Sequence, residues 1–115
     1  MGKVETNKKQ KNTTLLQTSF ELFTEKGFTK TTISDIVNRA GLAKGTFYLY
    51  FKDKYDLRDR LVTYKTSQLF GNAHTALIEQ NIQGFENQMF FVIDHIIDRL
   101  EKEPKLLQFI SKNLS

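Results

Sequence analysis

Apolar residues recur along this chain every three or four positions, which is the period of an α-helix, and no useful stretch alternates as a β-strand would. The clearest helical pattern covers residues 85–100, where Phe90 and Phe91 widen the apolar face. A helix with so wide an apolar face is expected to be buried on more than one side. Similar spacing predicts further helices over residues 13–26, 32–40, 43–51, 53–80 and 104–114. The pattern therefore predicts an all-α fold.

Residues 1–12 differ from the rest of the chain because they hold lysines and almost no apolar side chains. The lysines are Lys3, Lys8, Lys9 and Lys11. A polar chain end of this kind is typical of a flexible arm. Thr13 or Thr14 can cap the first helix, and Gly27 can end it. We therefore expect a flexible basic arm over residues 1–12, followed by a helix.

Residues 32–51 have the arrangement of a helix-turn-helix unit, in which a tight turn joins two short helices. Thr32 is a good N-cap for the first helix, Asp35 lies in its first turn, and Gly41 can form the turn. The side chains expected to anchor the pair in a core are Ile36, Val37, Leu42, Phe47 and Phe51. Glycine-punctuated helix pairs also occur in plain helical bundles, so the spacing alone leaves both structures open.

The second helix of this unit carries polar side chains that suit a nucleic acid, because ammonium and hydroxyl groups are common phosphate partners. They are Lys44, Thr46, Tyr48 and Tyr50, followed by Lys52 and Lys54 at the start of the next helix. The alternative is that the tyrosines are half-buried packing residues and the lysines form a solvated rim.

The charge of the chain is unevenly distributed. The net charge is +4 over 115 residues. Residues 1–65 hold 13 Lys and Arg against 7 Asp and Glu, a net charge of +6, whereas residues 66–115 hold 4 against 6, a net charge of −2. A basic front half favours a polyanionic partner. A solvated basic surface would give the same count.

Several other classes of site are not expected. The chain has no Cys, which excludes disulfides, thiolate metal sites and cysteine nucleophiles. His74 and His95 lie far apart in sequence, and Asp94 and Asp98 suit the polar face of a helix. We expect no catalytic residue, metal site or cofactor, and therefore no enzyme. No apolar run approaches the length of a membrane span, and a cytoplasmic location is expected.

The run TTISDIVNRAGLAKGTFYLYFKDKYDL resembles the signature of the TetR family of transcriptional regulators. The preceding LLQTSFELFTEKGFTKTT resembles the first helix of that family. The resemblance is continuous from Thr13 to Leu61 and is most specific through Gly45-Thr46-Phe47-Tyr48, Tyr50-Phe51 and Lys54. It implies a three-helix DNA-binding bundle with a helix-turn-helix over residues 13–60. A longer fourth helix would join this bundle to a partial C-terminal regulatory and dimerisation domain over residues 61–115.

The resemblance also implies roles for individual residues. Thr32 corresponds to a cap that touches a phosphate, and Tyr48 to a phosphate-contacting tyrosine. Lys44, Gly45 and Thr46 lie where the recognition helix enters the groove of the DNA, and Gly45 allows close approach of the backbone.

The remaining positions of the expected contact surface flank that helix. Leu49 and Tyr50 occupy positions that vary with operator sequence, and Lys54 matches a phosphate-binding lysine. Ala43 departs from the family pattern, because many members have Ser or Thr at this cap. Alanine cannot cap, at a cost of about 1 kcal/mol.

The function implied is a sequence-specific transcriptional regulator in the bacterial cytoplasm, associated with the nucleoid. It would act as a ligand-responsive repressor that binds a palindromic operator in double-stranded DNA as a homodimer. One alternative is a TetR-like activator or adaptor whose C-terminal domain binds a partner protein instead of a small molecule. Another is a helical interaction module without a DNA role, which would show no salt-sensitive DNA binding.

Members of the family usually run well beyond 115 residues, and their C-terminal helices form the effector pocket and the dimer interface. We therefore expect the chain to stop inside that domain, with effector-binding residues beyond Ser115. Apolar side chains that the further helices would cover should be exposed, namely parts of Phe90, Phe91, Leu107 and Ile110. Self-association through this patch is expected.

Overall fold

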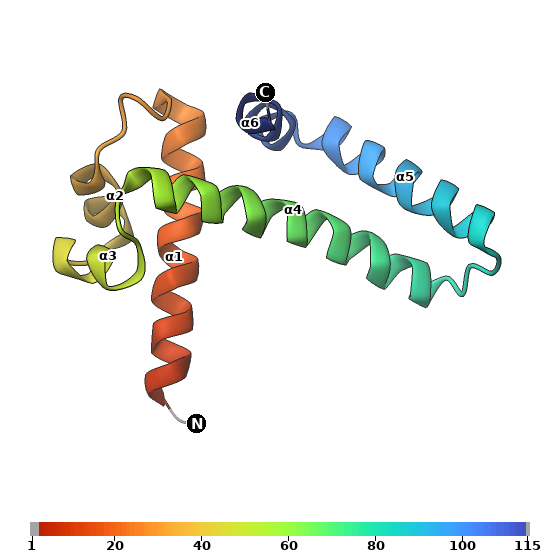
Figure 1. Cartoon of the computed structure of the whole chain (residues 1–115), viewed down its shortest axis with the longest axis horizontal. Helices are drawn as coiled ribbons and strands as arrows, with labels where there is room; N and C mark the ends of the chain where they lie inside the picture. Colours follow the sequence, from red (N-terminus) through yellow and green to blue (C-terminus); the bar gives the residue numbers. More distant parts are fainter. Residues whose placement is uncertain (1–2, 115) are drawn as a thin grey trace. The chain divides into compact units, whose positions relative to one another are not determined.

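The computed structural model describes residues 3–114, which form six helices and no strand (Figure 1). The helices are α1 (Lys3–Lys26), α2 (Ile33–Ala40), α3 (Lys44–Tyr50), α4 (Lys54–Glu79), α5 (Phe85–Lys102) and α6 (Pro104–Leu114). The predicted all-α fold is confirmed.

The first helix begins earlier than the sequence pattern predicts. Helix α1 starts at Lys3, so Thr13 and Thr14 lie inside it and do not cap it. The part of the expected flexible arm that the structure describes, residues 3–12, is therefore helical. Its Lys, Gln and Glu residues have high helix propensity, and no Gly or Pro interrupts the chain between Lys3 and Lys26. The apolar pattern missed these turns because they carry few apolar residues.

The chain forms two compact units, which divide between Leu61 and Val62. In the first unit, α2 packs against both α1 and α3 (Figure 1). Its buried apolar side chains come from every helix of the unit: Leu15, Leu16, Leu22, Phe23, Ile36, Val37, Phe47, Leu57 and Leu61, with Phe51 between α3 and α4. The burial predicted for Ile36, Val37, Phe47 and Phe51 is confirmed. The division into a DNA-binding and a regulatory domain stays a prediction.

The turn between α2 and α3 is built on Gly41. This residue has φ +72° and ψ +31°, the left-handed conformation that costs a residue with a side chain about 1 kcal/mol or more. Its N–H donates to the carbonyl of Asn38, and the N–H of Leu42 donates to that of Val37 at 2.9 Å. These bonds satisfy carbonyls that the end of α2 leaves open. The chain can therefore turn at once into α3.

The second unit holds the remainder of α4 together with α5 and α6. Its buried apolar residues are Leu69, Ala73, Leu106, Phe109 and Ile110. None of them belongs to α5, so the expected burial of that helix on more than one side is wrong. An apolar pattern gives the width of a face but does not show whether another element covers it.

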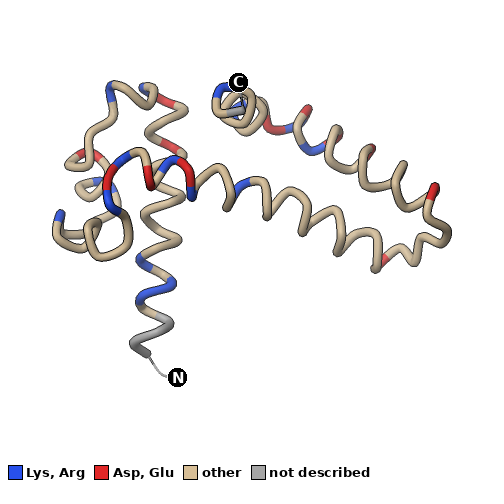
Figure 2. The backbone as a smooth tube through the Cα atoms, viewed as in Figure 1, with Lys and Arg blue, Asp and Glu red and all other residues tan. Residues whose placement is uncertain are grey.

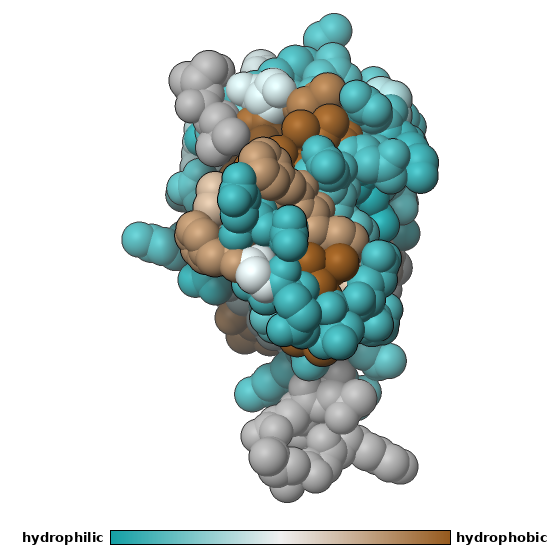
Figure 3. All heavy atoms as spheres, turned by 90° about the vertical axis from the view of Figure 1, so that its right-hand side faces the viewer, coloured by the Kyte–Doolittle hydropathy of each residue, from teal (hydrophilic) through white to brown (hydrophobic). Residues whose placement is uncertain are grey.

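The predicted apolar patch is only partly exposed. Phe90 is 59% exposed and Leu107 is 44% exposed, whereas Phe91 is half-buried. Ile110 is buried, which corrects the expectation for that residue, because it joins Leu106 and Phe109 in the core of the second unit. Figure 3 looks onto the turn between α4 and α5 and shows apolar surface between hydrophilic side chains.

Candidate nucleic-acid interface

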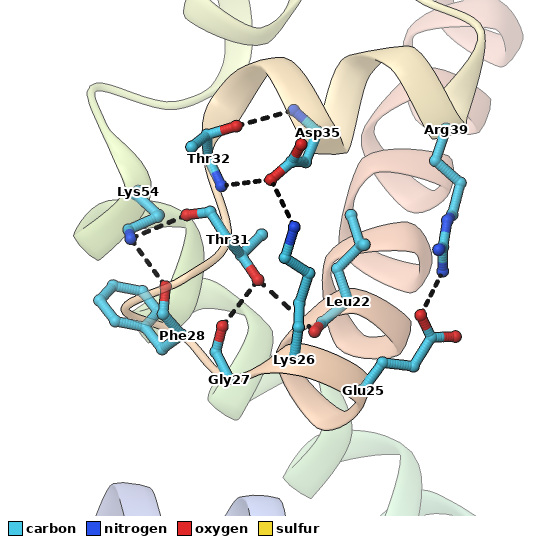
Figure 4. A network of polar contacts seen from close by, with 10 residues as sticks. All are labelled: Leu22, Glu25, Lys26, Gly27, Phe28, Thr31, Thr32, Asp35, Arg39 and Lys54. Atoms are coloured by element: carbon cyan, nitrogen blue, oxygen red, sulfur yellow. Dashed lines mark hydrogen bonds and ion pairs between the residues drawn. The ribbon is translucent and has the colours of Figure 1, made fainter.

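The first helix of the helix-turn-helix begins in a reciprocal pair of hydrogen bonds (Figure 4). The Thr32 side-chain oxygen accepts from the N–H of Asp35 at 3.0 Å, and the Asp35 carboxylate accepts from the N–H of Thr32 at 3.0 Å. This capping box satisfies two amides that the start of a helix leaves open. Since a hydroxyl can donate while it accepts, exposed Thr32 can still donate to a phosphate oxygen.

Two ion pairs hold α2 against α1 in the orientation that Figure 4 shows. The Lys26 ammonium lies 3.0 Å from Asp35, and the Arg39 guanidinium lies 3.0 Å from Glu25. Both pairs are solvent-exposed, so each contributes little to stability. The Thr32 backbone N–H, followed by the Lys26 ammonium, lowers the pKa of Asp35 to about 2. Asp35 therefore stays ionised to a lower pH than an ordinary aspartate does.

Helix α3 separates an apolar anchor from an outward surface. Phe47 is completely buried, and its ring lies 5.5 Å from that of Phe51. Tyr48 is 52% exposed and Leu49 is 79% exposed. Leu49 therefore contributes nothing to the core, and a single exposed leucine is ordinary on a protein surface.

The other predicted contact residues of α3 lie around the same surface. Lys44 and Gly45 are exposed, and Thr46 and Tyr50 are half-buried. The structure thus brings the predicted residues of α3 together on one short helix, which packs on α2, whereas Thr32 lies at the start of α2.

Ala43 stands at the N-cap of α3 with φ −78° and ψ 150°, and its side chain makes no cap hydrogen bond. The expectation that this helix lacks a side-chain cap is confirmed. The carbonyl of Ala43 accepts from the N–H of Thr46 at 3.0 Å, so the first turn closes through the backbone.

Lys54 lies in contacts that the sequence did not reveal. Its ammonium donates to the carbonyl of Phe28 at 2.7 Å and to that of Thr31 at 2.9 Å, and it lies 4.2 Å from the centroid of the Phe28 ring. The Arg58 guanidinium lies 4.6 Å from the same centroid. The acceptors are main-chain atoms, which carry no signal in a sequence.

Lys and Arg residues are distributed along the backbone of the first unit (Figure 2). Those with exposed side chains include Lys8, Lys9, Lys11, Lys30, Lys44 and Lys52. Some basic side chains form ion pairs within the unit: Arg39 pairs with Glu25 and Arg60 with Asp56. Charges on exposed lysines act over a distance of about 8–10 Å at moderate salt.

The two histidines belong to the second unit. His74 is exposed, and His95 stacks on the Phe91 ring at 6.0 Å. Within residues 3–114 no group of three or more His, Asp or Glu could hold a metal ion. In the same range no helix has both the length and the apolar character needed to cross a bilayer.

A capped short helix, a glycine turn and a second short helix with an outward polar face are the geometry of helix-turn-helix proteins. The family profile described as bacterial regulatory proteins, tetR family, matches residues 15–61. Over residues 15–61 the chain is similar to the TetR family of transcriptional regulators. This is a non-enzymatic class, in agreement with the sequence-based expectation.

Individual relatives agree with this assignment. The chain is 45% identical over 64 residues to the uncharacterized HTH-type transcriptional regulator YvdT of Bacillus subtilis (strain 168), covering 52% of this chain and 33% of that protein. It is 34% identical over 64 residues to the HTH-type transcriptional repressor KstR2 of Rhodococcus jostii (strain RHA1), covering 56% of this chain and 31% of that protein. The chain therefore spans about a third of the length of these relatives.

A solved structure extends the similarity in fold. The crystal structure of a TetR family transcription regulator from Marinobacter aquaeolei VT8 superposes with a TM-score of 0.78 at 19% identity. The superposition covers 93% of this chain and 55% of that chain. At this identity the similarity concerns the fold alone.

Proposed function

We propose that this chain carries the DNA-binding part of a transcriptional regulator that reads a palindromic operator in double-stranded DNA as a homodimer. The observation that carries the proposal is the division of α3 into a fully buried Phe47 and an outward surface with Tyr48 and Leu49. A recognition helix needs this division, because one face anchors it while the other enters the major groove.

The proposed contacts fall into two groups. Thr32 and Tyr48 form the group directed at phosphates, which fixes the register of the protein on the duplex. Family resemblance adds Lys54 to this group, although its ammonium already donates to two main-chain carbonyls. The second group enters the groove and consists of Ala43, Lys44, Gly45, Thr46, Leu49 and Tyr50. Lys44 suits a guanine edge, and Leu49 suits a thymine methyl group. Exposed Gly45 has no side chain to hold the backbone away from the DNA.

We further propose that the whole protein is a ligand-responsive repressor that works in the bacterial cytoplasm at the nucleoid. The relative KstR2 is described as a repressor, which supports that sign of regulation. A cavity in the second unit is lined by residues such as Lys65, Arg99 and Glu103 and measures about 120 Å³. Ligand sites usually measure about 300–1,000 Å³. The proposed effector site is therefore a property of the whole protein and does not correspond to this cavity.

A titration of fluorescently labelled duplex DNA, followed by anisotropy at several salt concentrations, tests the DNA-binding proposal. The affinity should fall steeply as the salt concentration rises, and Lys44→Ala should weaken binding and relax the preference at one base pair, because Lys44 is assigned to a guanine edge. Lys105→Ala, which removes an exposed lysine from α6, is the matched control and should leave both the affinity and the sequence preference unchanged. Binding that does not respond to salt would contradict the proposal and favour a helical interaction module.

Two further measurements separate the finer parts of the proposal. Tyr50→Ala should change the preference among duplex sequences more than it changes non-specific affinity. Sedimentation velocity in the presence of DNA should show two copies of the chain on one duplex. A single copy at saturation would contradict the palindromic site.

A further inference from the structure

The ammonium of Lys54 connects the first turn of α4 to the segment between α1 and α2 (Figure 4). Its two hydrogen bonds reach the carbonyls of Phe28 and Thr31, which lie 26 and 23 positions earlier in the chain. Hydrogen bonds from an ionised donor are about twice as strong as neutral ones. The contact is partly buried, so solvent competes with it less than with a surface ion pair.

The two carbonyls lie at the ends of one turn. The N–H of Thr31 donates to the carbonyl of Phe28 at 3.2 Å, which closes the turn. The Thr31 hydroxyl is buried and donates to the carbonyl of Gly27 at 2.7 Å, where α1 has just ended. Lys54 therefore holds the turn from the side of α4, while Thr31 holds it from the side of α1. The residue that follows is Thr32, the cap of α2.

We infer that Lys54 is a positioning residue for DNA binding, which acts by fixing Thr32 at the start of α2. This inference rests on the proposed DNA-binding function. An ammonium has three N–H donors, and two of them are directed at carbonyls here. The Phe28 ring lies 4.2 Å away and occupies a further side of the group. A phosphate would have to compete with partners that the protein already supplies.

The competing explanation is a direct phosphate contact by Lys54, and the two roles predict different results. A lysine that neutralises a phosphate releases counterions, so its loss lowers the salt slope by about 0.9. The loss of a lysine that positions an uncharged threonine lowers the affinity for DNA and leaves the salt slope unchanged. Only the positioning role predicts a local change around Thr32 in the protein without DNA.

The test uses the full chain and the variants Lys54→Met, Thr32→Val and the double variant. Amide hydrogen exchange of the free protein should be about tenfold faster at Thr31 and Asp35 in Lys54→Met, because a charge-assisted bond to the turn is lost. Amides in the middle of α1 should keep their protection. Lys52→Met is the matched control, since its exposed side chain lies two positions away, and it should leave both amides unchanged.

Affinity for a mixed-sequence duplex then tests the route through Thr32. Lys54→Met should lower the affinity about tenfold in the unmodified protein and less than twofold in the Thr32→Val background, because coupled residues are not additive. Equal losses in both backgrounds, or a fall of the salt slope by about 0.9, would overturn the inference. A general loss of stability would lower protection at all amides, and it would not couple Lys54 to Thr32.

Lys54→Arg covers the case in which the methionine variant does not fold. It keeps the charge, so a phosphate contact predicts unchanged amides and nearly unchanged affinity. The positioning role predicts faster exchange at Asp35 with an unchanged slope, because a larger, planar guanidinium does not reproduce the compact geometry of an ammonium between the two carbonyls. Unchanged amides in this variant would count against the inference. If the unmodified chain binds no duplex, the proposed function fails, and exchange at Asp35 still shows whether the contact organises the turn.

Discussion

Replacing Ala43 by serine should stabilise the protein, because α3 begins without a side-chain cap. The backbone at Ala43 already has the extended conformation of an N-cap, with φ −78° and ψ 150°. The side chain is exposed, so a hydroxyl can be added without disturbing the core. Thr32, which caps α2 in the same unit, shows the hydrogen bond that a serine at position 43 would supply to α3.

The size of the effect follows from the cap alone. Exchanging alanine for serine at an N-cap stabilises a helix by about 1 kcal/mol, within a range of about 0.5–2 kcal/mol. In a domain of about 60–100 residues, 1 kcal/mol shifts the midpoint of thermal unfolding by about 4–8 °C. The first unit ends at Leu61, so an upward shift of this size is expected for its transition.

Thermal unfolding followed by circular dichroism measures the shift. Ala43→Val is the control, because valine is as poor an N-cap as alanine and should leave the midpoint nearly unchanged. Ala43→Asp adds a cap and a negative charge at the helix start, and it should also stabilise the fold. On DNA the two stabilising variants should differ, since the aspartate repels phosphates and the serine does not.

The reasoning would be refuted if Ala43→Ser and Ala43→Val had the same midpoint. That result would mean that the open amides of α3 are satisfied in another way in the free protein. If Ala43→Asp bound DNA as tightly as the unmodified chain, the start of α3 would not face the phosphates.

Three further predictions concern the same unit. Gly41→Ala should lower the free energy of unfolding by about 1 kcal/mol, because φ is +72° and the added methyl group meets no other atom. Gly41→Asn should lower it less, since asparagine tolerates the left-handed conformation better. Equal stability of the unmodified protein and both variants in urea would contradict this prediction. The free energy of unfolding should fall as the pH drops from 3.8 towards about 2, because Asp35 has a lower pKa in the folded than in the unfolded protein and becomes protonated in this range. Asp35→Asn should remove this part of the pH dependence. Ser19→Ala should be neutral or stabilising by up to about 1 kcal/mol, since the buried Ser19 hydroxyl has no hydrogen-bond partner among the described residues; clear destabilisation in urea would show that it has one.

The parts of the fold that could be predicted from sequence are those fixed by local chemistry. Phe47 and Phe51 are four positions apart, so a short helix places both on its buried side. Thr32 followed by Asp35 specifies a capping box, and Gly41 specifies a left-handed turn. Each of these features involves residues that are close together in the chain.

The features that the sequence did not predict depend on contacts with residues that are distant in the chain, or on turns without apolar residues, and a local sequence pattern shows neither. The start of α1 at Lys3 has no apolar periodicity, because its first turns hold few apolar residues. The exposure of α5 depends on which elements cover it. The role of Lys54 depends on two carbonyls more than 20 positions away. Family resemblance led to a phosphate contact at this position, and the geometry adds an internal contact.

Because Lys54 donates to main-chain oxygens, substitutions can break the contact at position 54 but cannot remove its acceptors at positions 28 and 31. Any residue at positions 28 and 31 presents a carbonyl, so no exchange there can delete either acceptor. At position 54, only a side chain with a long stem and a compact donor can reach both. In a saturation library selected for operator binding, position 54 should therefore accept few residues, while variation at position 28 would be limited by the ring contacts of Phe28 alone.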